Sequence, residues 1–360
     1  MIDDRSSILP TDFADAPALA DTPLVEAAQE AEQAKLVALE ADLSEMYEIL
    51  RMAGMAAGIL RGRELMWFKG YGFADLAEKT PVTRDTPFHL ASLTKTFAST
   101  LLMQLVEQGK LDLDIPAATF GIDLKSRGTI TVRHLFSHTS GGIPGGRYRY
   151  DGSRFGQLDR VLKQITGRSF KANLDEIVIR PLGLKNTGDM NDALETKLAS
   201  PYQLSKSGAL VPGKYPTSFG SSAGLVASVS DYAMYIVGLK ENRFLRPQTQ
   251  ALAFTPTKSN SGRDLPYGLG WFVETIEGTK VIWHYGYWDS ISTLVLMVPD
   301  KDLTFLAFAN NDALSRGFDL GRGRIIKSPA GLIFLKNFGF VTKQSRTPFD
   351  FIYAIRRFFG

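Results

Sequence analysis

The chain of 360 residues contains no cysteine. This absence excludes disulfide bonds, thiolate metal sites and a cysteine nucleophile. It does not identify the compartment, because a chain without cysteine is compatible with either redox environment. Strong net charge is also missing: 41 Lys and Arg residues stand against 38 Asp and Glu residues, a formal charge of +3. Nothing in that balance points to nucleic acid as a partner.

Long apolar runs are absent as well. No stretch of about 18 consecutive apolar residues occurs, so the sequence predicts no membrane-spanning helix. The start, MIDDRSSILPTDF, is acidic and lacks the apolar segment of a signal peptide. We therefore expect a cytoplasmic protein from the chain as written, and a periplasmic or secreted one if a signal peptide has been removed.

Histidine is scarce too, with four in the whole chain. His134 and His138 are four residues apart, a spacing that on a helix can bind a metal, but no third ligand is evident. The sequence contains neither a phosphate-binding loop with its lysine nor a dinucleotide-binding fingerprint. We expect no metal and no cofactor.

What the chain does contain suggests four segments. Residues 1–21 form a polar lead-in, and Thr22 and Pro23 provide the N-cap and first-turn signals of a helix that we expect over 22–51. Leucines and a methionine at 3–4 spacing predict one apolar stripe on this helix, which packs on the main body or, alternatively, on a partner helix. Residues 52–318 form the predicted catalytic domain, and 319–360 form a tail.

The predicted catalytic domain has strand-like runs at both ends and helices between them. A hairpin pattern covers AAGIL and LMWFKGYGF, and four further strands end near Asn310. A strong amphipathic helix is expected over 93–108, and a helix-rich subdomain over about 116–215. This arrangement predicts an α/β (α+β) fold in which an antiparallel sheet, built from both ends of the chain, is flanked by helices.

The tail is basic and rich in phenylalanine. From 321 to 360 its charged residues are Arg322, Arg324, Lys327, Lys336, Lys343, Arg346, Arg356 and Arg357 against Asp350. Such a segment suits peripheral contact with an anionic membrane or self-association. It is equally able to wrap around the parent domain.

The chemistry centres on Ser92-Leu93-Thr94-Lys95, the one Ser-x-x-Lys sequence of the chain. Residues three apart on a helix share a face, so the Lys95 amine can reach the Ser92 hydroxyl. The helix N-terminus also directs N–H groups and partial positive charge toward that point. Lys95 can act as a base only if burial lowers its pKa from about 10.4 toward neutrality. The alternative is that Ser92 merely caps the helix and Lys95 is solvated.

An ordered series of segments surrounds this motif. Residues 88–114, 129–144, 150–170, 179–187, 221–236, 267–272 and 284–288 together resemble the serine β-lactamase and penicillin-binding-protein superfamily. The likeness is to its class C-like branch, which includes esterases and D-aminopeptidases, and it covers roughly residues 54–312. It implies a β-lactamase-like fold.

The resemblance also implies roles for individual residues. Ser92 matches the acylated serine, Lys95 its partner, and Tyr150 the tyrosine that moves protons between serine, lysine and leaving group. His284, Tyr285 and Gly286 match the third motif, and the N–H of Tyr287 would join that of Ser92 in the oxyanion hole.

Two positions depart from the family pattern. The second motif usually ends in an asparagine that holds the substrate amide, but here the residue is Gly152. The third motif has His284 where β-lactamases carry a lysine. Both changes weaken the expectation of antibiotic hydrolysis. Arg147, Arg149 and Arg154 are expected near the cleft rim, where they would favour acidic substrates or simply be solvated.

A competing nucleophile is Ser222, in a Gly-x-Ser-x-Gly sequence. That motif should follow a buried strand, whereas the preceding KYPTSF is polar and interrupted by proline. We therefore predict a serine hydrolase that forms an acyl-enzyme on Ser92, first a carboxylesterase on short or medium acyl esters. D-residue peptidase or amidase action, weak β-lactamase action, acyl transfer, and a non-catalytic assembly or membrane-associated protein of this fold remain as alternatives. The expected partner is a small ester or amide substrate.

Overall fold

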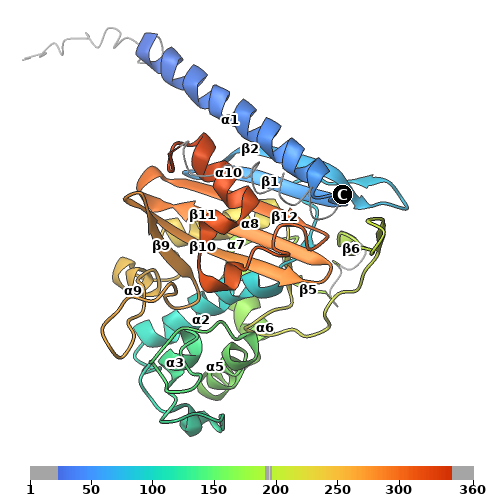
Figure 1. Ribbon diagram of the computed structural model, residues 1–360. Coiled ribbons are helices and arrows are strands. Elements are labelled where there is room, and N and C mark those ends of the chain that lie inside the picture. Colours follow the sequence, from blue (N-terminus) through green and yellow to red (C-terminus); the bar gives the residue numbers. More distant parts are fainter. Residues whose placement is uncertain (1–22, 191–193, 195–196, 343–360) are drawn as a thin grey trace, which may run out of the picture.

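A computed structural model describes residues 23–190, 194 and 197–342 (Figure 1). Its strands are β1 Gly54–Arg61, β2 Glu64–Asp75, β3 Thr80–Pro81, β4 Phe88–His89, β5 Gly188–Asp189, β6 Tyr202–Leu204, β7 Leu210–Pro212, β8 Leu225–Ala227, β9 Phe272–Ile276, β10 Thr279–Trp288, β11 Ile291–Val298 and β12 Leu303–Ala309. Its α-helices are α1 Pro23–Ile49, α2 Lys95–Glu107, α3 Val132–Phe136, α4 Gly152–Phe155, α5 Leu158–Thr166, α6 Phe170–Leu174, α7 Arg180–Leu182, α8 Val229–Lys240, α9 Pro247–Ala253 and α10 Pro329–Asn337.

Seven strands form one antiparallel sheet in the order β3-β2-β1-β12-β11-β10-β9. Strand β1, from the beginning of the domain, pairs with β12, from its end. The β9–β10 hairpin turns through Glu277 and Gly278, which both have positive φ, as a tight hairpin requires. The predicted antiparallel sheet built from both ends of the chain is therefore confirmed.

Helices cover both faces of this sheet, which explains why all eight residues of β11 and all seven of β12 are buried. Side chains alternate between faces along a strand. In β12, Leu306 and Phe308 join the core under α2 and α8, whereas Phe305 and Ala307 join the core under α1 and α10. Figure 1 shows the sheet between these two helical layers, with α3, α5 and α6 beyond α2.

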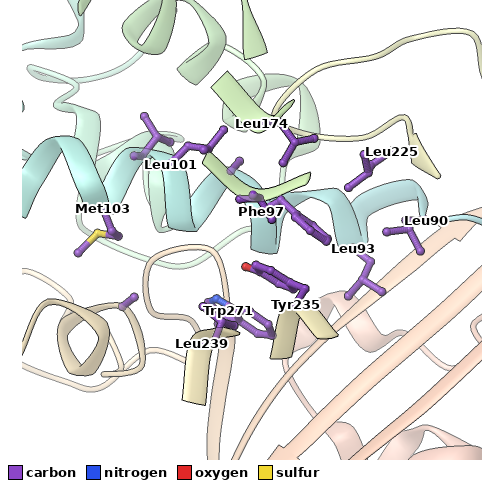
Figure 2. Packing of buried hydrophobic residues seen from close by; sticks show 14 of the residues in the cluster. Leu90, Leu93, Phe97, Leu101, Met103, Leu174, Leu225, Tyr235, Leu239 and Trp271 are labelled. Atoms are coloured by element: carbon purple, nitrogen blue, oxygen red, sulfur yellow. The ribbon is translucent and has the colours of Figure 1, made fainter. Parts of the chain in front are cut away.

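Helix α2 is almost completely buried, although its sequence includes polar residues. Its apolar side chains, including Phe97 and Leu101, lie in the core shown in Figure 2. Its two threonines inside the helix are also buried, but they have partners: Thr96 bonds the Tyr232 hydroxyl and Thr100 bonds that of Tyr235. Because a satisfied buried hydroxyl avoids the desolvation penalty of an unpaired one, α2 can pass through the middle of the molecule.

The segment before α2 forms a 3₁₀ turn, η1, over Ala91–Thr94. The predicted helix over 93–108 is thus observed, with helical backbone beginning slightly earlier and in a tighter form. The helical subdomain contains α3 to α7 and a single π-helical turn at Asp175–Ile179. It also contains the short strands β5, β6 and β7, which the sequence analysis did not predict.

The two ends of the described chain pack together. Helix α1 uses the stripe Leu36, Leu39, Leu43 and Met46 against the sheet and α10, which is the packing on the main body rather than on a partner helix. The described part of the tail, 319–342, contributes buried Ile333, Phe334 and Leu335 to the same core, so this part wraps the parent domain. Residues 343–360 and the lead-in lie outside the described residues. No helix in the described ranges is long and apolar enough to cross a membrane.

Candidate active site

Ser92 stands at a sharp change of chain direction. Strand β4 pairs with β8, and the N–H of Leu90 donates to the carbonyl of Leu225 at 2.7 Å. The next residue, Ala91, has a φ of 46°. Left-handed backbone is unfavourable for a residue with a Cβ and persists only where surrounding contacts enforce it. Here it turns the extended segment into η1, so that Ser92 lies on the first helical turn.

His89 is one of the contacts that hold this turn, and sequence reasoning missed it. Its Nδ1 accepts the backbone N–H of Ala91 at 3.0 Å. The ring is 2% exposed, and burial lowers its pKa to about 4, so the imidazole is neutral and carries its hydrogen on Nε2. That Nε2 is buried and has no hydrogen-bond partner among the residues that the structure describes. The only signal in the sequence was a histidine within the otherwise apolar FHLA.

Lys95 lies on the first turn of α2, directly behind Ser92. Its Nζ is 2.9 Å from Ser92 Oγ and 2.7 Å from the carbonyl oxygen of Ser222. The side chain is fully buried, and this desolvation lowers the pKa of Lys95 to about 7, while the carboxylate of Asp151 opposes the shift. Because a carbonyl can only accept, one N–H must point to Ser222. The lone pair of the neutral amine is then free to face the Ser92 hydroxyl.

Tyr150 covers the same amine from the other side. Lys95 Nζ lies 5.2 Å from the centre of the Tyr150 ring. The tyrosine hydroxyl is buried and has no well-aligned hydrogen bond within the described residues, but the nearby Ser92 side chain interacts with it and opposes the rise in its pKa. Burial dominates and raises the pKa of Tyr150 well above 10. In this geometry Tyr150 is a neutral phenol, able to donate a proton.

Strand β10 forms the wall opposite α2, and Gly286 allows it to approach. A Cβ on Gly286 would lie 2.1 Å from the carbonyl oxygen of Leu90 and 2.4 Å from Thr293 Oγ1, so the strand and the turn before Ser92 touch through backbone. Thr293 Oγ1 donates to the same Leu90 oxygen at 3.0 Å. This contact brings the end of β10, and with it the backbone of Tyr287, to the turn that carries Ser92.

His284 occupies the position expected from the third motif, but its ring is completely buried. Its Nδ1 donates to the carbonyl of Tyr285 at 2.8 Å, and its Nε2 accepts from the Tyr267 hydroxyl at 2.9 Å. Burial and the nearby Lys95 lower its pKa well below 6.5. His284 is therefore neutral and does not supply the positive charge that a lysine would supply there.

Two further positions from the sequence analysis, Gly152 and Ser222, border Lys95 in different ways. A Cβ on Gly152 would lie 3.8 Å from Lys95 Nζ, so the missing asparagine side chain would have entered the site. Ser222 reaches the site through its carbonyl oxygen, which accepts from Lys95. Both ring nitrogens of His284 contact Tyr285 and Tyr267, so this histidine does not contact Ser222.

The two histidines weighed as a metal pair do not act together. His134 Nδ1 accepts the Thr131 N–H, whereas His138, just beyond α3, accepts the Asp151 N–H. Within the described ranges, no group of three His, Cys, Asp or Glu side chains could hold a metal ion.

A cavity of about 810 Å³ opens beside Tyr150. Its lining comes from three segments, 147–150, 263–266 and 315–322, together with Tyr285 and Tyr287 of β10. We call it the arginine cavity, because Arg147, Arg149, Arg263 and Arg322 line it. Of the three arginines expected at the rim, Arg154 is not in this lining; it donates instead to the carbonyls of Ser140 and Lys125.

Comparison with known proteins places this arrangement in a family. The family model described as Beta-lactamase matches residues 39–326. A penicillin-binding protein of Bacillus subtilis (strain 168) is 22% identical over 301 residues, which are 70% of this chain and 66% of that protein. Esterase EstB of Burkholderia gladioli is 24% identical over 306 residues, covering 65% of this chain and 77% of the esterase.

Solved structures agree on the fold. The octameric penicillin-binding protein homologue from Pyrococcus abyssi superposes with a TM-score of 0.76 at 22% identity, covering 88% of this chain and 80% of that one. The family match spans most of the chain and includes every segment that builds the site. The chain therefore belongs to the Beta-lactamase family of serine hydrolases.

Proposed function

We propose that Ser92 is the nucleophile of a two-step acyl transfer to water, and that the enzyme is a carboxylesterase acting on short or medium acyl esters. The observation that carries this proposal is the contact between Ser92 Oγ and the Nζ of a fully buried Lys95. A lysine with a pKa of about 7 is substantially neutral at physiological pH and can accept the serine proton.

In the first step, Ser92 Oγ attacks the ester carbonyl while its proton passes to Lys95 Nζ. The carbonyl oxygen takes the negative charge and is stabilised by the backbone N–H groups of Ser92 and Tyr287. The carbon–oxygen bond to the leaving alcohol then breaks, and the alkoxide takes a proton from the Tyr150 hydroxyl, which Lys95 reprotonates. This leaves an acyl-Ser92 ester and a free alcohol.

In the second step, water adds to the acyl carbonyl. Its proton moves to the amine–phenol pair, the bond to Ser92 Oγ breaks, and the serine regains its proton. The products are a carboxylic acid and free enzyme. Tyr150 suits the relay because its buried hydroxyl interacts with Ser92 and has no other hydrogen-bond partner in the described part of the chain. The buried His284 holds the hydroxyl of the neighbouring Tyr267.

The ester preference is supported by Gly152. Hydrolysis of an amide benefits from a side chain that holds the substrate amide, and at this position only a hydrogen atom faces Lys95. An ester has a better leaving group and needs less of this assistance. The esterase among the relatives fits the same assignment.

The test is to treat the protein with a fluorophosphonate and to locate the adduct by intact mass and peptide mapping, alongside turnover of 4-nitrophenyl butyrate. We expect one phosphonyl group on Ser92, and loss of turnover by several orders of magnitude in Ser92→Ala. The matched control is Ser222→Ala, which should label normally. Label on Ser222 would contradict the assignment of the nucleophile, and no label on any serine would indicate a non-catalytic member of the fold. Faster turnover of D-residue amides or of nitrocefin than of esters would overturn the ester preference alone.

A further inference from the structure

The arginine cavity contains more positive charge than the protein itself neutralises. Its two carboxylates already have partners: Asp264 pairs with Lys258 at 2.6 Å and Asp319 pairs with Arg322 at 2.5 Å. Within the described part of the chain, the side chains of Arg147, Arg149 and Arg263 form no ion pair.

This cluster of charge is held in place by the fold. The segment that carries Arg263 is a small hairpin closed by the Lys258–Asp264 bridge, and it docks on the segment that carries Arg147. Asn260 connects the two segments through two hydrogen bonds. Its backbone N–H donates to the carbonyl of Gly145 and its Nδ2 donates to that of Pro144, both at 2.9 Å. Like charges that line one cavity without a counter-ion repel each other. An anion bound among them would reduce this repulsion.

The cavity also borders the candidate catalytic groups, through Tyr150. Tyr150 contributes to its lining and at the same time covers Lys95. The Tyr148 hydroxyl donates to the carbonyl of Gly321 at 3.0 Å and so ties the arginine-bearing segment to the opposite side of the cavity. A substrate with its carbonyl at Ser92 that extends past Tyr150 therefore enters the arginine cavity.

We infer that the arginine cavity is a subsite for an anionic group on the substrate, so that the enzyme acts on esters bearing a carboxylate or phosphate. This inference rests on the proposed function. Guanidinium groups bind carboxylate and phosphate oxygens through paired N–H donors. Three guanidinium groups that form no ion pair with the described residues line this cavity. Tyr285 and Tyr287 supply the apolar surface along which the link between the ester and the anion lies.

The experiment compares two substrates that differ only at the far end: 4-nitrophenyl hydrogen adipate, which is a monoanion, and neutral 4-nitrophenyl hexanoate. A second pair, 4-acetoxybenzoate and 4-acetoxybenzamide, places the charge on the leaving group. For at least one pair we expect kcat/KM to favour the anion by about tenfold at low salt, the order expected for one hydrogen bond to a charged group. Raising the ionic strength from about 0.01 to 1 M shortens the Debye length from about 30 to 3 Å and should remove most of this preference.

The variants are Arg147→Gln combined with Arg149→Gln, and Arg263→Gln alone. In each, the anion-to-neutral ratio of kcat/KM should fall, by about tenfold in the double variant. Arg180→Gln is the matched control, because Arg180 is exposed on α7 and is not part of the lining; it should leave the ratio unchanged. Turnover of the neutral esters with no anion preference in either pair, or a preference that survives all of these variants, would overturn the subsite. No turnover of any ester would instead refute the proposed function.

Discussion

Lys95 and the arginine cavity share one neighbour, Tyr150, but the two kinds of basic side chain lie in opposite environments. Lys95 is fully buried, and burial lowers its pKa to about 7, so that a large fraction of the amine is uncharged near neutral pH. Arg147, Arg149 and Arg263 are exposed. Desolvation converts an ammonium into a base, whereas a guanidinium is a cation that attracts an anion. Groups of the same sign can therefore serve reactivity at the floor of a cleft and selectivity at its rim.

The largest effect on activity is expected when the buried amine of Lys95 is removed. Lys95→Met fills a similar volume without a base, and we expect kcat/KM for 4-nitrophenyl butyrate to fall by about 10³-fold or more, the range of a lost general base. In the unaltered protein, kcat/KM should decline as pH falls below about 7, because protonated Lys95 cannot accept the serine proton. A pH profile of kcat/KM from 5 to 9 measures this directly. A flat profile would show that Lys95 is not the titrating base.

The next effect concerns His89, which holds the turn that presents Ser92. His89→Leu removes the acceptor for the Ala91 N–H and frees the strained turn that presents Ser92. We expect kcat to fall by about 10- to 100-fold with little change in KM, since about 1 Å of misplacement can cost about 10²-fold.

His89→Asn is the matched variant, because its Oδ1 can accept the same N–H. It should restore most of the rate, and steady-state kinetics with thermal melts of both variants make the comparison. If the leucine and asparagine variants lose activity equally, His89 does not position Ser92 through this bond.

The smallest effect is expected at Ser222, because its backbone carbonyl, and not its side chain, contacts Lys95. Ser222→Ala retains the carbonyl that accepts from Lys95 Nζ, so kcat/KM should stay within about threefold of the starting value. The same ester assay suffices. A loss of kcat/KM by several orders of magnitude would instead indicate that Ser222 is the nucleophile.

Much of this site follows from spacing. Residues three apart at a helix start bring Ser92 and Lys95 together, and strand-like runs at both ends of the domain predicted the sheet. The role of His89 was not predictable, because it depends on a positive φ at Ala91, and nothing in an alanine signals that conformation. Ser222 was weighed as a nucleophile, whereas it contributes a carbonyl, which every residue possesses. Arg154 was expected at the rim because a charge in a loop resembles any other; its hydrogen bonds to backbone carbonyls depend on tertiary packing.

The pairing of β1 with β12 has a consequence for how the protein is made. Met55 lies opposite Ala309, so the middle of the sheet joins residues that are far apart in the sequence and are synthesised at different times. Until β12 leaves the ribosome, the β1–β2 hairpin has an unpaired edge, and such edges favour pairing with other chains. Strand β10, which forms the wall beside Ser92, is also synthesised long after β1. A chain released before β10 and β12 therefore lacks both the closed sheet and this wall, so the sheet and the candidate site are completed at the same stage of synthesis.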